Sequence, residues 1–223
     1  MVTFEGLDEE LIHFLQTDAT VPPEQRLAGS TATVALVRHD RIVIANCGDS
    51  RAVLCRRNGS ALDVSVDHRP SRQSAGGAAE IARVNASGGW VADGRVLGIL
   101  SVSRAFGGHE FKAGRQKLLT DGIALKYWKA DKVEGRQLTQ PVVVPTPDVC
   151  EVDLEDGDAF LIVATDGLWD CCTSAQAVHF LRGELSRNGM DAQLAADALV
   201  EHAVGRRKTK DNVAAIVVLL RRC

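Results

Sequence analysis

The sequence has few aromatic residues and no strong excess of either charge. Aromatic side chains make up only 4% of the 223 residues, whereas apolar residues as a whole make up 45%. A core must therefore consist mostly of Val, Ala, Leu and Ile, and the apolar share is too high for a disordered chain. The formal net charge of −3 gives no general attraction to nucleic acid, so we expect no nucleic-acid partner.

The sequence also lacks the cysteine patterns and the long apolar runs that mark other protein classes. Its six cysteines form no Cys-x-x-Cys pair and lie at no zinc-ligand spacing with histidine: Cys47, Cys55, Cys150, Cys171, Cys172 and Cys223. We expect thiols in a reducing compartment rather than disulfides or a zinc site. No stretch reaches the roughly 18 apolar residues of a membrane-spanning helix, and the first residues do not resemble a signal peptide.

Short apolar segments separated by tight turns indicate antiparallel strands. Strands are predicted at residues 31–37, 41–46, 51–56, 62–66, 159–165 and 213–219. Helices are predicted at residues 8–18, 78–86, 173–187 and 191–204. Because strands dominate the first part of the chain and helices the later part, the order favours an α+β fold, in one domain over residues 1–223.

Four aspartates follow or precede apolar strands in this pattern. Asp166 directly follows Phe-Leu-Ile-Val-Ala-Thr, Asp170 lies four residues later, Asp211 precedes the last strand, and Asp49 lies in a turn between two strands. Carboxylate oxygens bind hard cations such as Mg²⁺ and Mn²⁺. Aspartate is also common in turns and helix caps, and for any single one of these residues that is the commoner use. A turn or cap role explains Asp166 less well, since burying an acid at the end of an apolar strand costs free energy unless the carboxylate is solvated or bound.

Six motifs in the chain resemble those of the metal-dependent, type 2C serine/threonine protein phosphatases, and they occur in the order of that family. The motifs are Gly29–Thr33, Ala45–Arg51, Asp67–Pro70, Ser103–Gly107, Ala164–Asp170 (Ala-Thr-Asp-Gly-Leu-Trp-Asp) and Asp211–Asn212. The resemblance implies a four-layer α-β-β-α sandwich, in which helices flank two antiparallel sheets. It also implies hydrolysis of phosphoserine and phosphothreonine on proteins, and we expect a monomer.

In this resemblance, Asp166 and Asp211 bind a two-metal centre of Mg²⁺ or Mn²⁺, and Asp49 and Asp170 hold a third, weaker ion. The implied reaction is direct attack of a metal-activated water on phosphorus, without a covalent phosphoenzyme. The residues agree with that route, because the chain contains no Cys-x5-Arg motif of the cysteine-dependent phosphatases. A metal-dependent nuclease, which also uses clustered acids, is a remote alternative, because a basic groove is not evident in the sequence.

The segment 108–147 has weak periodicity, many charges and several Gly and Pro residues. Such a long loop in a compact domain is often functional. The segment occupies the flap region of the family, and together with Gly88–Trp90 and Asp93–Arg95 it is similar to the plant and algal thylakoid-associated phosphatases of the light-harvesting antenna. The resemblance implies antenna phosphoproteins as substrates and a chloroplast location, in the stroma or at the thylakoid surface. A tolerated surface loop is the alternative.

Four residues are candidates for substrate contacts at this flap: Arg104, Lys126, Tyr127 and Trp128. The family pattern also begins with an arginine, a Glu-Asp pair and an Asp-Gly-His-Gly-Gly block, none of which is in this chain. We therefore expect an N-terminally truncated domain whose general acid and phosphate-binding arginine lie upstream of Met1. His68 and His109 are weaker candidates for the general acid. The alternative function is a pseudophosphatase that binds a phosphoprotein without turnover.

Overall fold

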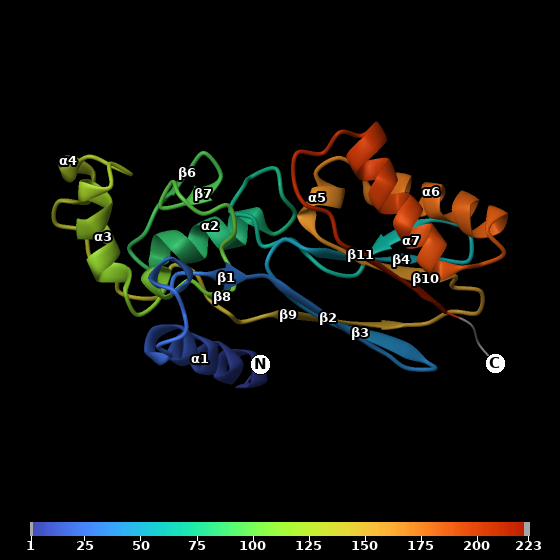
Figure 1. The fold of residues 1–223 in the computed structure, drawn as a ribbon, viewed down its shortest axis with the longest axis horizontal. Coiled ribbons are helices and arrows are strands. Elements are labelled where there is room, and N and C mark those ends of the chain that lie inside the picture. Colours follow the sequence, from blue (N-terminus) through green and yellow to red (C-terminus); the bar gives the residue numbers. More distant parts are fainter. Residues whose placement is uncertain (1, 221–223) are drawn as a thin grey trace. The chain divides into compact units, whose positions relative to one another are not determined.

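The computed structural model describes residues 2–220, which form two compact units. The first unit comprises Met1–Ala32 and Asp67–Pro147, and the second comprises Thr33–Val66 and Asp148–Cys223. Both contain helices and antiparallel strand pairs, so the predicted α+β class is confirmed (Figure 1). The prediction of one domain over the whole chain stays a prediction.

Two sheets make up the centre of the second unit. The four-stranded sheet has the order β11-β10-β4-β5, with β4 at Arg51–Cys55, β5 at Ala61–Asp63, β10 at Phe160–Ala164 and β11 at Ala215–Leu219. The three-stranded sheet has the order β2-β3-β9, with β2 at Ala32–Val37, β3 at Arg41–Cys47 and β9 at Asp148–Asp153. Most predicted strands are therefore present, with ends shifted by a few residues.

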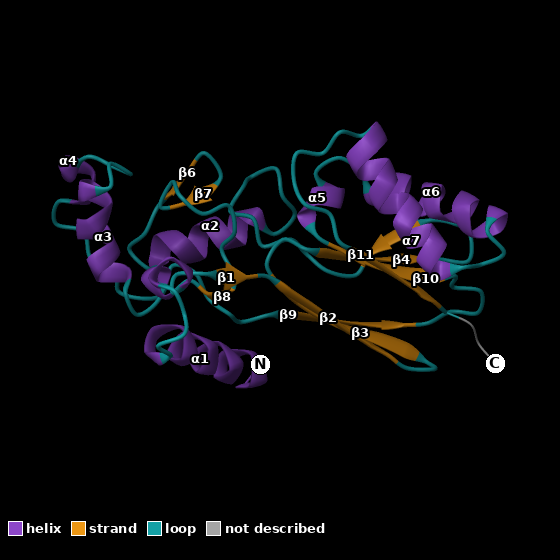
Figure 2. Ribbon diagram, viewed as in Figure 1, coloured by secondary structure: helices purple, strands orange, loops and turns teal. Residues whose placement is uncertain are grey.

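The alternating side chains of the four-stranded sheet build two separate cores in this unit. Phe160 and Ile162 belong to a cluster with the helices α6 (Ser174–Arg187) and α7 (Ala192–Glu201). Leu161, between them, belongs to a second cluster with Ile42 and Ile44 of β3. Successive residues of a strand point to opposite faces, so one face carries the helices and the other packs on the three-stranded sheet (Figure 2).

Both helices begin where their sequences predict. Thr173 and Gln176 form a reciprocal capping box at the start of α6, and Asp191 accepts a hydrogen bond of 2.9 Å from the backbone N–H of Leu194 at the start of α7. Such caps satisfy backbone N–H groups that have no partner within the helix. A π-helical turn, His202–Arg206, extends α7 and confirms the predicted helix 191–204.

The first unit consists of short elements around its own apolar cluster. It contains α1 (Val2–Thr17), a 3-10 turn (Pro23–Gln25), β1 (Gly29–Ser30), α2 (Gly77–Ala86), β6 (Val91–Ala92), β7 (Arg95–Val96), β8 (Phe106–Gly107), a 3-10 turn (His109–Phe111), α3 (Arg115–Ala124) and α4 (Ala130–Val133). β1 pairs with β8, and β6 pairs with β7, both antiparallel. Within the described residues, no helix is both long and apolar enough to cross a membrane.

The expectation of an irregular loop at 108–147 is wrong in its middle, where α3 and α4 form. The indole of Trp128 lies against Gly122 of α3, where an added Cβ would come within 2.2 Å of the ring. Glycine disfavours a helix interior, so the residue that makes room for Trp128 also weakens the helical pattern in the sequence. Trp128 Nε1 donates to the Leu119 carbonyl at 3.1 Å, which anchors the indole on α3.

The cysteines are thiols in the part of the chain that the structure describes. Cys55 and Cys172 are buried, as is Cys47, and Cys150 and Cys171 are half-buried. Burial raises the pKa of the Cys172 thiol, with the neighbouring Cys171 as a second cause, to about 11. A thiol with so high a pKa is a poor nucleophile, so Cys172 is suited to packing rather than to chemistry. Cys223 lies outside the described residues.

Candidate metal centre

The strand register brings three of the candidate aspartates to one edge of the four-stranded sheet. Ala164 at the end of β10 pairs with Arg51 at the start of β4 and with Ala215 at the start of β11. Asp49 lies two residues before Arg51, and Asp166 and Asp211 lie just beyond the paired ends of β10 and β11. Segments far apart in sequence thus meet where the sheet ends.

Backbone contacts hold the Asp166 and Asp211 loops together. The Thr165 N–H donates to the Ala214 carbonyl at 3.0 Å, and the Ala214 N–H donates to Thr165 Oγ1 at 3.0 Å. Gly167 lies against the next loop, because an added Cβ would be 2.2 Å from the Asn212 carbonyl oxygen. Only glycine allows so close an approach of two backbones, which explains the glycine directly after Asp166.

Asp170 lies one helical turn after Asp166. The short helix α5 spans Asp166–Trp169, and the Asp170 N–H donates to the Asp166 carbonyl at 2.8 Å. Residues four apart share a face of a helix, so the two carboxylates belong to the same side of this turn. Leu168 is buried, and Trp169 Nε1 donates to the Ala164 carbonyl at 2.9 Å, so the turn is anchored on the end of β10.

Asp49 is the most buried of the four candidates, with 4% of its surface exposed. Its turn is held by Asn46, whose Nδ2 donates to the carbonyls of Gly48 at 3.2 Å and Val66 at 2.9 Å. Thr33 Oγ1 donates to Asn46 Oδ1 at 2.6 Å. A carboxylate so far from water needs compensating positive charge or donors, which suits a residue beside a cation.

Asp170 and Asp211 open into a common hollow of about 600 Å³. Cations line it as well, and they come from the segment Arg207–Lys210 directly before Asp211. A phosphoryl group carries nearly two negative charges near neutral pH. The arrangement therefore places groups that attract phosphate next to groups that bind hard cations.

The four flap candidates have different environments in the first unit. Arg104 Nη2 contacts Glu80 Oε1 at 2.6 Å, and its Nη1 donates to the Thr146 carbonyl at 3.0 Å. Trp128 is buried, whereas Lys126 and Tyr127 are exposed. Arg104 and Trp128 thus support the structure around them, and Lys126 and Tyr127 are accessible to a substrate.

The sequence profile described as Protein phosphatase 2C matches residues 3–213. The chain belongs to the protein phosphatase 2C family. Protein phosphatase 2C 57 of Arabidopsis thaliana is 37% identical to it over 219 residues, which are 98% of this chain and 55% of that protein. The chain spans about half the length of the curated relatives it matches.

Two solved structures share the fold of this phosphatase 2C chain. A serine-threonine phosphatase 2C from Toxoplasma gondii has a TM-score of 0.67 at 23% identity, over 97% of this chain and 64% of that one. A C. elegans sex determining protein has a TM-score of 0.71 at 22% identity, over 98% of this chain and 45% of that one. The predicted arrangement of antiparallel sheets with helices is confirmed by these likenesses.

The phosphatase 2C family depends on Mg²⁺ or Mn²⁺, and the chemistry of the donor set in this chain fits such ions. All four candidates are carboxylates, the ligand type that hard cations prefer. Within residues 2–220, no three or more His, Cys, Asp or Glu side chains lie close enough together to hold a metal ion. Mg²⁺ is commonly bound through one or two carboxylates, with waters and phosphates as the other ligands, so this set remains suitable.

A buried network around Glu80 of α2 was not anticipated from the sequence. Arg83 Nη2 lies 3.2 Å from Glu80 Oε2, and Ser103 Oγ donates to the same oxygen at 2.7 Å. Ser103 Oγ and N–H also face the carbonyl of His68, which is itself buried. The sequence signal is a single glutamate three residues before an arginine in a helix of small and apolar residues.

We expect Glu80 to make folding of this unit sensitive to acid. Burial alone would raise the pKa of Glu80, but hydrogen bonds from Arg104 and Ser103 outweigh burial and lower the pKa from 4.5 to about 2. A carboxyl whose pKa is depressed in the folded state stabilises above its unfolded pKa and loses that contribution as pH falls. The loss amounts to about 3 kcal/mol between about pH 4.5 and pH 2.

Unfolding free energies measured from about pH 6 downward test this. The wild-type curve is expected to fall more steeply than that of Glu80→Gln, which cannot titrate at this position. Glu9→Gln, at an exposed position on α1, is the matched control and should follow the wild-type slope. Parallel curves for the wild type and Glu80→Gln would show that Glu80 does not carry the acid sensitivity.

Proposed function

We propose that this protein hydrolyses phosphoserine and phosphothreonine on proteins, with Mg²⁺ or Mn²⁺ held at the sheet edge of the second unit. The observation that carries the proposal is the strand register, which brings the loops of Asp49, Asp166 and Asp211 to that edge, where β10 ends and β4 and β11 begin. Membership of the phosphatase 2C family supports the reaction class.

The roles of the residues follow from their chemistry. Asp166 and Asp211 would hold the ions, with Asp49 and Asp170 at a third, weaker site. A bound divalent ion supplies charge that polarises the phosphoryl group and lowers the pKa of water. Arg207, Lys208 and Lys210 line the hollow beside Asp211 and would draw the phosphate of the substrate toward it.

The finer proposal is that the substrates are phosphoproteins of the light-harvesting antenna and that the protein acts in the chloroplast. Its support is the similarity of Gly88–Trp90, Asp93–Arg95 and the segment 126–148 to thylakoid-associated phosphatases. In the structure these segments, as far as Pro147, lie in the first unit, around α3, α4 and the β6-β7 hairpin. The exposed side chains of Lys126 and Tyr127 would contact the substrate and so determine which phosphoprotein is bound.

Phosphate release from peptides by the purified protein tests the proposal. A phosphothreonine peptide is expected to be hydrolysed only with Mn²⁺ or Mg²⁺, and EDTA should stop the reaction because both ions are removed. An antenna-derived sequence should be hydrolysed faster than a scrambled one of equal charge. Equal rates on the two sequences would contradict only the proposal that antenna phosphoproteins are the substrates. Phosphate release in EDTA would contradict metal-dependent hydrolysis itself.

A non-catalytic role is the second candidate, and the lack of a three-ligand cluster in the described part of the chain favours it. In that case the protein would bind a phosphopeptide but release no phosphate with any divalent ion. Binding by calorimetry, measured beside the release assay on the same peptide, separates the two functions.

A further inference from the structure

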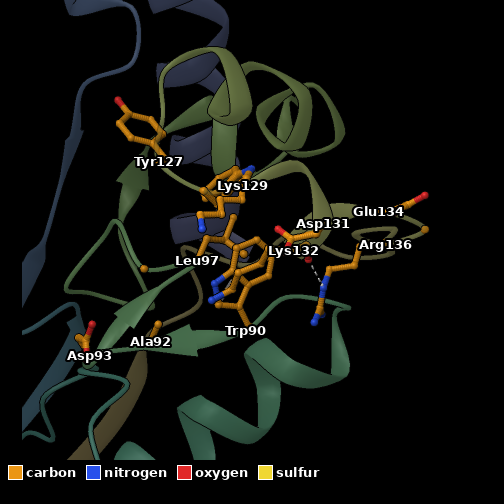
Figure 3. A pocket seen from close by; sticks show the side chains of 13 residues that line it. Trp90, Ala92, Asp93, Leu97, Tyr127, Lys129, Asp131, Lys132, Glu134 and Arg136 are labelled. Carbon is orange, nitrogen blue, oxygen red and sulfur yellow. Dashed lines mark hydrogen bonds between the residues drawn. The ribbon is translucent and has the colours of Figure 1, made fainter.

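A pocket of about 880 Å³ lies in the first unit (Figure 3), whereas the aspartates described above belong to the second unit. Its lining comes from two segments, residues 90–98 and 127–136. Trp90 and Trp128 are buried and meet edge to face, with 5.2 Å between ring centroids. The volume is in the range of sites that hold ligands, about 300–1,000 Å³.

Two cations converge on one aromatic ring in this pocket. Lys132 Nζ lies 5.4 Å from the centroid of the Trp90 ring, and Arg136 Cζ lies 5.3 Å from it. Arg136 Nε donates to the Lys132 carbonyl at 2.8 Å, which orients the guanidinium. Cation–π contacts position charges without neutralising them, so the positive potential of both groups remains.

No carboxylate neutralises these cations in the described part of the chain. Neither Lys132 nor Arg136 forms a salt bridge there, and the ion pair seen on α3, Lys117 with Asp121, involves other residues. Asp93, Asp131 and Glu134 also line the pocket; Figure 3 shows Asp131 next to Lys132, and Asp93 and Glu134 farther from Trp90. The two cations at Trp90 therefore stay available to an anionic ligand, although three acids also line the pocket.

The wall of the pocket is preformed. Trp128 is held against Gly122 and by its hydrogen bond to the Leu119 carbonyl, and Lys126, with φ of 61°, makes the turn that brings it there. A rigid site with unneutralised charge gains more from a charged ligand than a flexible one, because less ordering is needed on binding.

We propose that this pocket binds an anionic group of the substrate polypeptide, a carboxylate or a second phosphoryl group, distinct from the phosphate that is hydrolysed. The inference rests on the proposed function, because it takes the ligand to be a phosphoprotein. Lys132 and Arg136 supply charge-assisted hydrogen bonds, and the neighbouring Tyr127, 54% exposed, offers a surface for the peptide chain.

The test measures binding of phosphothreonine peptides by calorimetry in EDTA, where turnover plays no part. Three peptides differ at one position on each side of the phosphothreonine, carrying glutamate, phosphoserine or glutamine. The wild type is expected to bind the glutamate or the phosphoserine peptide about tenfold more tightly than the glutamine peptide. Whichever anionic peptide gains more identifies the chemical source of the group.

The double variant Lys132→Gln/Arg136→Gln should lose that preference and bind the glutamine peptide as the wild type does. Lys117→Gln, on the same flap but paired with Asp121, is the matched control and should keep the preference. Equal affinity of the wild type for all three peptides, or an unchanged preference in the double variant, would overturn the proposal. Because this assay needs no phosphate release, a failure of the proposed catalysis would be seen separately in the release assay.

Discussion

Replacing Asp166 with asparagine is expected to lower Mn²⁺-dependent phosphate release by more than about 100-fold, since loss of an outer-shell partner alone costs 10–100-fold. The residue lies where β10 ends and α5 begins, beside the loop of Asp211. Asparagine keeps the size of the side chain and is accepted at the start of a helix. The change therefore removes negative charge and one anionic ligand while leaving the turn intact.

The control for this variant is Asp153→Asn at the exposed end of β9 in the same unit. It removes the same charge from the protein without touching the sheet edge, so its activity should equal that of the wild type. Thermal unfolding of both variants should stay close to that of the wild type. Activity of Asp166→Asn within a few-fold of the wild type would mean that Asp166 does not hold the ion.

The largest expected effect on stability comes from Lys112→Met in the first unit. Lys112 Nζ contacts both carboxylate oxygens of Asp8, at 2.6 and 2.7 Å, and donates to the Ala105 carbonyl at 2.9 Å. The Gly107 N–H donates to Asp8 Oδ1 at 2.7 Å. Only 5% of the Lys112 surface and 4% of the Asp8 surface are exposed, so water has little access to the ion pair. The pair links α1 to the start of the segment 108–147.

Removing one partner of a buried ion pair leaves the other charge without compensation, which costs about 3–5 kcal/mol. We expect that loss in the unfolding free energy of Lys112→Met, measured by denaturant titration with circular dichroism. Lys117→Met, whose ion pair is exposed, should cost less than about 1 kcal/mol. The double variant Asp8→Asn/Lys112→Met should recover part of the loss, because the buried charge is then absent. A loss below about 1 kcal/mol for Lys112→Met would show that the pair does not hold α1 in place.

The elements that the sequence predicted well are those with local signals. The strand predicted at 41–46 is β3 at Arg41–Cys47, and the one predicted at 159–165 is β10 at Phe160–Ala164. Alternation of side chains and tight turns mark such strands, and the capping box at Thr173 marks the start of α6. The strand ends then place Asp49, Asp166 and Asp211 at one edge through register alone.

The features that the sequence did not predict depend on partners far apart in the chain. Lys112 and Asp8 are 104 residues apart, and Arg104 lies 24 residues from Glu80. No local pattern connects such residues, so the interpretation of Arg104 as a substrate contact did not anticipate its ion pair with a buried glutamate. The helix α3 was missed because Gly122, which accommodates Trp128, interrupts its apolar pattern.

Anomalous diffraction from crystals soaked in Mn²⁺ is the most direct test of the central claim that the sheet edge of the second unit is a metal centre. The account predicts manganese peaks within bonding distance of the carboxylates of Asp166 and Asp211, with a weaker peak near Asp49 and Asp170. Peaks only elsewhere, with none at this edge at saturating Mn²⁺, would contradict it.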